Sequence, residues 1–236
     1  MALARVTAQD ASNTGATSSP ASATYPSTPT QGNLLVAVAV AAGGTTNEAS
    51  MSITSAGWTK AVGGAISASS GVQIWYKVAG AGESTTVTLT ASGSPTACRL
   101  AIYEYDGFVG TPTLDKTAAG VADTGVTSMS TGTTATTTAA AEALVAAIGI
   151  NNTPAGISWT NSFATILAAS RILTGERIVA AAAAYETTAS WTTAAGAIGI
   201  LATFKDVVTA VQRGIGGIGG GLSLPSTGAV AVGGVL

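Results

Sequence analysis

Two long, mainly apolar runs dominate the first half of the chain, at residues 34–40 and 99–105. Continuous runs of this kind, rich in β-branched side chains and bounded by turn residues, are typical of strands that are buried on both faces. Between them, residues 72–77 and 86–90 alternate between apolar and polar side chains, which is the two-residue period of a strand with one polar face. The pattern predicts a β-sheet structure over residues 32–107.

A fainter copy of this pattern follows at residues 139–206. Its residues 143–148 correspond to the first apolar run, and its residues 198–204 correspond to the last. The segment between the two copies, residues 111–138, is rich in Thr and Gly and weakly patterned, and we interpret it as a crossover. We therefore predict an all-β fold, a jelly-roll-like β-sandwich built from two half-repeats.

Two alanine-rich segments of the second copy, residues 139–150 and 178–185, could also form helices. Alanine has the highest helix propensity of all residues, so each segment taken alone would favour a helix. Their place in the repeat, the Thr run before the first segment, and the glycines Gly149 and Gly199 favour strands instead. We predict strands for both.

The two ends of the chain have a different composition from the predicted sandwich, which spans residues 32–206. Residues 1–31 are rich in Ser, Thr and Ala, with prolines that prevent a helix, and we expect an extended N-terminal segment with at most an edge strand. Residues 207–236 form a Gly-rich apolar C-terminal arm, which has no charged side chain beyond Arg213. A glycine-rich string cannot fold by itself.

Isolated apolar residues recur along this arm. Regularly spaced apolar side chains suit a segment that lies against a neighbouring surface, where each side chain fills a pocket. The alternative is a tail without a role. We expect the interaction residues of the arm to be Ile215, Ile218, Leu222 and Leu224.

The composition excludes several classes of partner. Charged residues are only 8% of the chain, against about 25% in ordinary soluble domains. The hydrophobic share is 47% and the net charge is −2, a combination that argues against intrinsic disorder. The nine basic residues are scattered, so we expect no binding to nucleic acid or to an anionic membrane. No uninterrupted apolar segment of about 18 residues predicts a membrane span, and the N-terminus lacks the features of a secretory signal.

The sequence offers few residues for catalysis. It contains no histidine, which excludes Ser-His-Asp and Cys-His mechanisms and removes the commonest nitrogen ligand of zinc. Cys98 is the only cysteine, so no intrachain disulfide can form, and we expect it to be buried on the same side as Leu100 and Ile102. Glu104 and Asp106 face the same side of a strand, but a structural role is favoured over glycosidase chemistry. We predict no catalytic residue, metal site or cofactor.

Tryptophan side chains are the remaining candidates for ligand binding. Exposed, coplanar indole rings can stack against sugars, although most aromatic residues of a sandwich belong to its core or rim. Trp75 and Trp159 are the residues we would assign to such a role.

One set of motifs resembles a known class of proteins. The chain reads Gly-Asn-Leu-Leu-Val from Gly32, Gly-Trp-Thr-Lys from Gly57, Ile-Trp-Tyr-Lys from Ile74 and Ala-Ile-Tyr-Glu-Tyr-Asp-Gly from Ala101, and the second half ends in Leu-Ala-Thr-Phe-Lys from Leu201. This pattern resembles jelly-roll-like β-sandwich modules of tailed-phage virion proteins and bacterial surface proteins. The resemblance covers residues 32–205, implies a fold and a setting, and transfers no site residues.

The absence of a secretory signal favours the phage setting, because a virion protein is made in the host cytoplasm and leaves it inside an assembled particle. The resemblance therefore implies a non-enzymatic virion structural protein, and we expect a capsid decoration (cement) protein that binds the major capsid protein or other virion proteins and stabilises the head. Homotrimers are common in such settings, so we expect a homo-oligomer, with a trimer as the first guess. Two alternatives stay open: a tail fibre or host-recognition module, and a carbohydrate-binding surface module.

Overall fold

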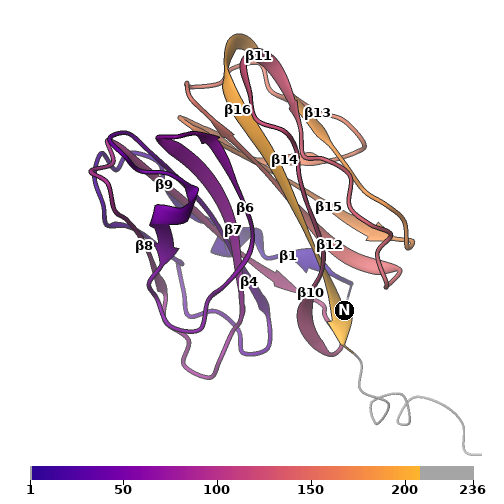
Figure 1. The fold of residues 1–236 in the computed structure, drawn as a ribbon. Helices are drawn as coiled ribbons and strands as arrows, with labels where there is room; N and C mark the ends of the chain where they lie inside the picture. Colours follow the sequence, from indigo (N-terminus) through magenta and orange to yellow (C-terminus); the bar gives the residue numbers. More distant parts are fainter. Residues whose placement is uncertain (1, 208–236) are drawn as a thin grey trace, which may run out of the picture.

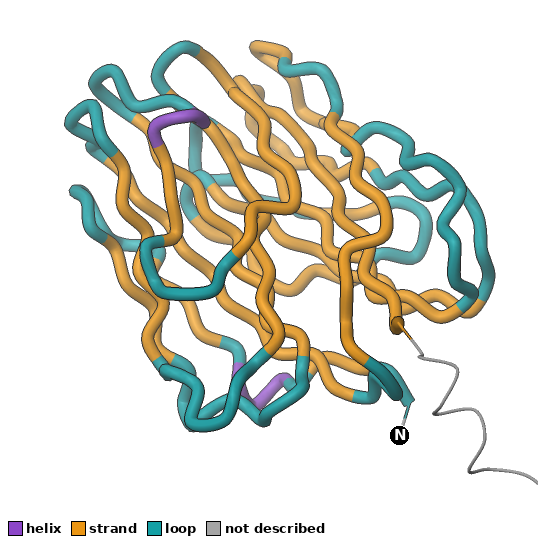
Figure 2. Tube along the Cα trace, turned by 60° about the horizontal axis from the view of Figure 1, so that its bottom comes forward, coloured by secondary structure: helices purple, strands orange, loops and turns teal. Residues whose placement is uncertain are grey.

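The computed structural model describes residues 2–207 of the 236-residue chain. These residues are almost entirely strands and connecting loops, with two single-turn 3-10 helices, η1 (Thr7–Gln9) and η2 (Glu48–Ser50) (Figure 2). The strands in chain order are β1 (Ala4–Arg5), β2 (Ala11–Asn13), β3 (Ala21–Thr24), β4 (Leu34–Ala42), β5 (Met51–Ile53), β6 (Thr59–Ser67), β7 (Ser70–Val78), β8 (Thr86–Ala91), β9 (Ala97–Asp106), β10 (Thr111–Ala119), β11 (Asp123–Ser130), β12 (Ala141–Ile150), β13 (Ser158–Trp159), β14 (Ala164–Ala169), β15 (Ile172–Ala180) and β16 (Thr188–Val207). The prediction of an all-β sandwich is confirmed.

The first half of the chain forms a six-stranded sheet and a three-stranded sheet. The large sheet has the order β1-β9-β4-β7-β6, with β2 also paired to β9, and the small sheet has the order β3-β8-β5. Every residue of the central strand β4 is buried, as its continuous apolar sequence predicts. Its odd-numbered side chains, such as Leu35, pack toward the small sheet, and its even-numbered ones, such as Val36, pack toward the second half of the molecule.

The second half repeats this strand order. Its seven-stranded sheet has the order β10-β16-β12-β15-β14, with β11 and β13 also paired to β16. Strand β12 takes the central place that β4 has in the first half, and β16, β15 and β14 correspond to β9, β7 and β6. The alanine-rich residues 141–150 form β12, as the repeat predicts. The strand predicted over residues 178–185 is wrong beyond Ala180, where β15 ends.

Strand β16 belongs to two layers. Its first part, around residues 188–190, pairs with β11 and β13, while its later part from Ala197 onward pairs with β12 and β10. The first part covers the outer face of the sheet, where Trp191 and Met129 pack on Ile148. Each half-repeat therefore adds an outer layer to its large sheet, while the two large sheets pack face to face. Figure 1 shows the two units side by side, indigo to purple and pink to yellow.

The main core lies between the two large sheets. It contains the even-numbered side chains of β4, together with Tyr103 and Tyr105 from β9 and Phe204 from β16. Close approach of the sheets requires glycine at two positions. A Cβ atom on Gly64 would lie 2.6 Å from Ile198 Cδ1, and one on Gly149 would lie 2.8 Å from Ile66 Cδ1.

Three regions outside the two apolar repeats were predicted from composition: the crossover, the N-terminal segment and the C-terminal arm. The crossover over residues 111–138, whose sequence is weakly patterned, contains strands β10 and β11. The N-terminal residues 1–31 supply β1 and β2 to the six-stranded sheet and β3 to the three-stranded sheet. Apart from Val207, which ends β16, the predicted C-terminal arm with its four interaction residues lies outside the described residues.

Candidate functional site

A charged cluster joins the N-terminal segment to the second half of the molecule. The Arg5 guanidinium forms an ion pair with Asp10 and donates a hydrogen bond from Nε to Glu176 Oε1 on β15 at 2.9 Å. The guanidinium carbon also lies 6.0 Å from the ring centroid of Tyr103. The Tyr103 hydroxyl in turn forms a 2.6 Å hydrogen bond with Thr174 Oγ1. These contacts connect β1 and β9 of one half to β15 of the other.

Burial decides the protonation behaviour of this cluster. It raises the pKa of Asp10 above its usual value, although the hydrogen bond from Arg5 opposes the shift. It also raises the pKa of Tyr103 well above the ordinary value for a phenol. Asp10 Oδ1 and Glu176 Oε2 have no hydrogen-bond partner among the described residues. The cluster therefore links the two halves through charged contacts that are partly removed from water.

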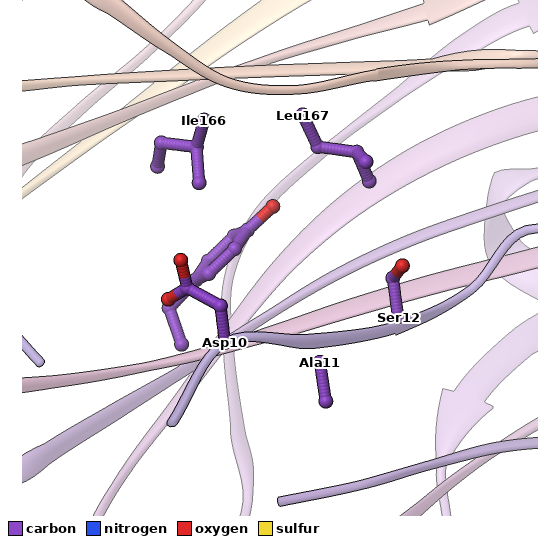
Figure 3. Close-up of a pocket in the computed structure, with 6 residues that line it drawn as sticks. Asp10, Ala11, Ser12, Ile166 and Leu167 are labelled. Atoms are coloured by element: carbon purple, nitrogen blue, oxygen red, sulfur yellow. The ribbon is translucent and has the colours of Figure 1, made fainter. Parts of the chain in front are cut away.

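A small pocket of 160 Å³ lies beside this cluster, at the boundary of the two halves. Figure 3 shows Asp10 and Ser12 on one side of it and Ile166 and Leu167 on the other. Pockets that bind small molecules usually have volumes of about 300–1,000 Å³. Since this pocket is smaller and its only carboxylate is paired with Arg5, we assign it no substrate.

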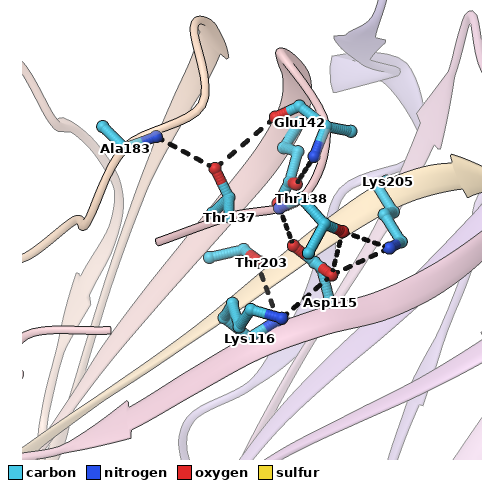
Figure 4. A network of polar contacts seen from close by, with 9 residues as sticks. Asp115, Lys116, Thr137, Thr138, Glu142, Ala183, Thr203 and Lys205 are labelled. Carbon is cyan, nitrogen blue, oxygen red and sulfur yellow. Dashed lines mark hydrogen bonds and ion pairs between the residues drawn. The ribbon is translucent and has the colours of Figure 1, made fainter. Parts of the chain in front are cut away.

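A second charged cluster lies at one end of the second half, around Asp115 of β10. The Asp115 carboxylate accepts hydrogen bonds from the backbone N–H and the hydroxyl of Thr138, both at 2.6 Å, and lies 2.9 Å from Lys205 Nζ and 3.4 Å from Lys116 Nζ (Figure 4). Burial by itself would raise the pKa of Asp115. The hydrogen bonds from Thr138 and Lys205 outweigh burial and hold this pKa well below its usual range.

Glu142, at the start of β12, belongs to the same cluster, but its pKa is shifted in the opposite direction to that of Asp115. Its side chain is fully buried, and burial raises the pKa of its carboxyl group. The Ala139 N–H, which donates to Oε1 at 3.2 Å, and the neighbouring Thr203 hydroxyl oppose this shift, and the Asp115 carboxylate adds to it. Both clusters connect residues of different strands through charged contacts.

The carboxylate pair that the sequence suggested is divided between two environments. Glu104 is 1% exposed, and its Oε1 accepts hydrogen bonds from the Thr30 N–H at 2.9 Å and from Asn33 Nδ2 at 2.6 Å. Asp106 lies at the end of β9 and lines a separate cavity. The structure thus gives Glu104 a backbone donor, which is the structural role that the sequence favoured. Cys98 is buried with Leu100 and Ile102, as predicted.

The two tryptophans proposed for stacking lie in different cores. Trp75 packs between the six-stranded and three-stranded sheets, and its Nε1 donates to Gln73 Oε1 at 2.8 Å. Trp159 packs on the outer face of the second sheet and stacks on Phe163 with ring centroids 6.4 Å apart. Both side chains are half-buried, and the structure does not bring them together into a flat platform.

Sequence reasoning did not find the two charged clusters. Arg5 and Glu176 are 171 positions apart, so no local spacing connects them. The only available signal is the rarity of charge itself. In a chain with few charged residues, Glu142 at the start of an apolar run is an acid that must be buried with partners.

Two further features, a metal centre and a membrane-spanning helix, are not found within residues 2–207. No three histidine, cysteine or acidic side chains come together there in a way that could hold a metal ion. In the same residues no helix is long and apolar enough to span a bilayer.

Comparison with protein-family models, with curated proteins and with solved structures gives no match for this chain. Its function must therefore be inferred from its own surface and fold.

Proposed function

We propose that this chain is a structural protein of a phage virion, a decoration protein that binds the head surface through its C-terminal arm and stabilises the capsid. In this role it binds the major capsid protein or a neighbouring virion protein, and it forms a homo-oligomer, with a trimer as the first candidate. It requires no cofactor and carries out no reaction.

The distribution of charge and hydroxyl groups on the described residues carries this proposal. Charged residues are only 8% of the chain, and ten of those in the described residues form six ion pairs, so the surface carries little charge for its size. The outer face of the three-stranded sheet presents hydroxyl groups instead, such as the exposed pairs Ser22 with Thr88 at 2.9 Å and Thr24 with Thr86 at 3.3 Å. A surface of this kind suits a protein that works on the outside of an assembly and has no basic patch for nucleic acid.

The sequence of the arm supplies the attachment. Residues 214–236 contain no charged side chain, and their isolated apolar residues can each insert into a neighbouring surface. Burial of one Ile or Leu side chain contributes about 1.5–3 kcal/mol before ordering costs. Several such contacts, repeated in each subunit of an oligomer, would give strong attachment through multivalency.

Protein stoichiometry in purified particles tests the proposal. Quantitative mass spectrometry against the major capsid protein should give about one copy per capsid subunit, or a simple fraction of it. A few copies per particle would instead indicate a tail fibre or host-recognition module. Absence from particles would refute both virion roles and favour a surface module, for which glycan binding lost in Trp75→Ala or Trp159→Ala would be the evidence.

Truncation tests the arm directly. A chain that ends at Gly214 should fold but fail to bind particles that lack the protein. The matched control is a full-length chain with Val121→Ser, since Val121 is 87% exposed on the turn between β10 and β11. Unchanged particle binding by the truncated chain would overturn the role of the arm.

A further inference from the structure

A cavity of 570 Å³ opens beside the end of the last described strand. Its walls come from the N-terminal segment, the loop before β4 and the loop between β9 and β10, and its lining includes Val6, Thr30, Asn33, Asp106, Phe108 and Val109. Unlike the pocket beside Arg5, this cavity falls within the usual volume range of binding pockets. Nothing in the charged clusters or the proposed attachment to particles uses it.

The cavity is apolar with an acidic end. Val6, Phe108 and Val109 supply the apolar part, and Val109 is 69% exposed. Asp106 lines the cavity, and no Lys or Arg side chain within residues 2–207 forms an ion pair with it. Such a site favours a segment with apolar side chains and one cationic group.

A second carboxylate lies behind the cavity wall. Thr30 and Asn33, which both line the cavity, donate to Oε1 of the buried Glu104. Its other oxygen, Oε2, has no partner among the described residues. Glu104 is buried and does not line the cavity, so Asp106 is the carboxylate that a cation inside the cavity would meet.

The chain reaches the rim of this cavity at the end of β16. The Asp206 carboxylate accepts hydrogen bonds from the backbone N–H groups of Val109 and Gly110, both at 2.9 Å. The next residue, Val207, pairs with Thr111 and is 46% exposed. Figure 1 shows the N-terminus, β10 and the end of β16 at the same end of the molecule.

We propose that this cavity binds residues 208–213 of the same chain. Val208 and Val211 match its apolar part, and Arg213, the one charged side chain in residues 208–236, matches Asp106. Six residues span up to roughly 20 Å when extended, which is enough to enter a cavity that begins at their own exit point. Because the segment is tethered at the rim, its effective concentration exceeds that of a second copy in dilute solution. The cavity thereby fixes the base of the arm, and the charge-free residues from Gly214 onward start from a defined point.

Disulfide trapping in the isolated full-length chain tests this proposal, and it needs no particles, so its outcome is independent of the virion role. The test variant is Val109→Cys with Val211→Cys, in which one position lines the cavity and the other lies in the proposed segment. The control is Ala141→Cys with Val211→Cys. Ala141 is exposed. Because Glu142 pairs with Lys205 in antiparallel register, Ala141 lies beside Asp206, on the edge of β16 that faces away from the cavity. The native Cys98 is fully buried and common to both variants.

Under mild oxidation the test variant should form an intramolecular disulfide at least tenfold faster than the control. Equal rates would overturn the proposal, because an undocked segment reaches both positions alike. Disulfide-linked dimers as the main product, also obtained on mixing the two single variants Val109→Cys and Val211→Cys, would overturn it in favour of docking into a second copy.

The proposed contact of Arg213 with Asp106 can be tested in the Val109→Cys with Val211→Cys variant. Asp106→Asn should slow disulfide formation at least threefold, and Arg213→Gln should do the same, whereas Asp123→Asn, on an exposed part of β11, should leave the rate unchanged. An unchanged rate with Asp106→Asn and Arg213→Gln would overturn the pairing of Arg213 with this wall.

Discussion

At the scale of single residues, the buried Glu142 makes the stability of the protein depend on pH. It is fully buried between strands, with Oε1 accepting a hydrogen bond from the Ala139 N–H and Oε2 without a partner among the described residues. Burial, with a smaller contribution from Asp115, raises its pKa above the ordinary value. A carboxyl group whose pKa is raised on folding stabilises the protein below its unfolded pKa of about 4.3, and this stabilisation is lost as the pH rises through the higher folded pKa.

Glu142→Gln should therefore stabilise the protein at neutral and alkaline pH. Glutamine keeps the acceptor oxygen and cannot ionise, so the ionisation penalty of the buried carboxyl group disappears. We expect the melting temperature at pH 8 to rise by about 2–4 °C, the shift that roughly 1 kcal/mol produces in a protein of this size, with a smaller rise at pH 4. Thermal unfolding followed by circular dichroism at both pH values measures this.

The control for Glu142 is Glu186→Gln, which changes an exposed acid and should alter the melting temperature little at either pH. A Glu142→Gln variant that is less stable than the wild type at pH 8 would show that the carboxylate, and not the acid, is the favoured form in the folded protein.

At the scale of elements, β12 shows why small residues are needed where the two large sheets meet. Its side chains that face the first half are Ala143, Val145, Ala147 and Gly149, and the last of these approaches Ile66 and Val72 from the opposing sheet. A larger residue at this end of β12 would force the sheets apart, because protein interiors are packed without spare volume.

Gly149→Ala should destabilise the protein by about 1–3 kcal/mol, the usual cost of overpacking a core. The reason is that the new Cβ would lie 2.8 Å from Ile66 Cδ1 and 2.9 Å from Val72 Cβ. Urea unfolding measures the loss. Gly15→Ala is the matched control, since no atom of a non-adjacent residue lies within 4 Å of the place that its Cβ would take, and it should have almost no effect. Equal stability of the two variants would mean that the sheets can separate at this point without cost.

The short strand β1 connects the halves through one side chain. Arg5 is 13% exposed, and its partners Asp10 and Glu176 belong to the N-terminal segment and to β15. Removal of the cation would leave two partly buried carboxylates without their main partner. An ion pair of this type is costly to break even where its formation adds little stability.

Arg5→Ala should lower the free energy of unfolding by about 3 kcal/mol. Lys60→Ala is the comparison, because the ion pair of Lys60 with Glu48 has a lysine side chain that is 42% exposed, and exposed pairs contribute less than about 1 kcal/mol. Urea unfolding of both variants measures the difference. Similar losses for the two would show that Arg5 is no more important than a surface charge.

At the scale of the whole molecule, the two half-repeats share one core. Strands β4, β7 and β9 bury one face against β12, β15 and β16, so neither half covers its large sheet by itself. The Arg5 cluster adds a polar connection across the same boundary. We therefore expect the halves to fold as one cooperative unit.

Calorimetry tests this cooperativity. The full chain should unfold in one transition whose calorimetric and van't Hoff enthalpies agree. A fragment of residues 1–110 should show no cooperative transition, because the buried face of β4 would be exposed to water. Two separate transitions in the full chain, or a folded fragment, would contradict the shared core.

The sequence by itself determined the strands that have a strong period and the place of most core residues. The apolar run at residues 34–40, the alternation at residues 86–90 and the burial of Cys98 follow from local pattern alone, because a strand places its side chains alternately on two faces. Comparison of the two halves also resolved the alanine-rich residues 141–150 as a strand, against their helix propensity.

Only the tertiary structure decided the rest. Strands β10 and β11 have weak patterns, and they form because β16 offers them an edge to pair with. The ion pair of Arg5 with Glu176 and the cavity beside Asp206 join residues that are far apart in the chain, so no local pattern contains them. Local periodicity reports which face of a strand is buried, whereas pairing partners and cavities depend on contacts that exist only after the chain has folded.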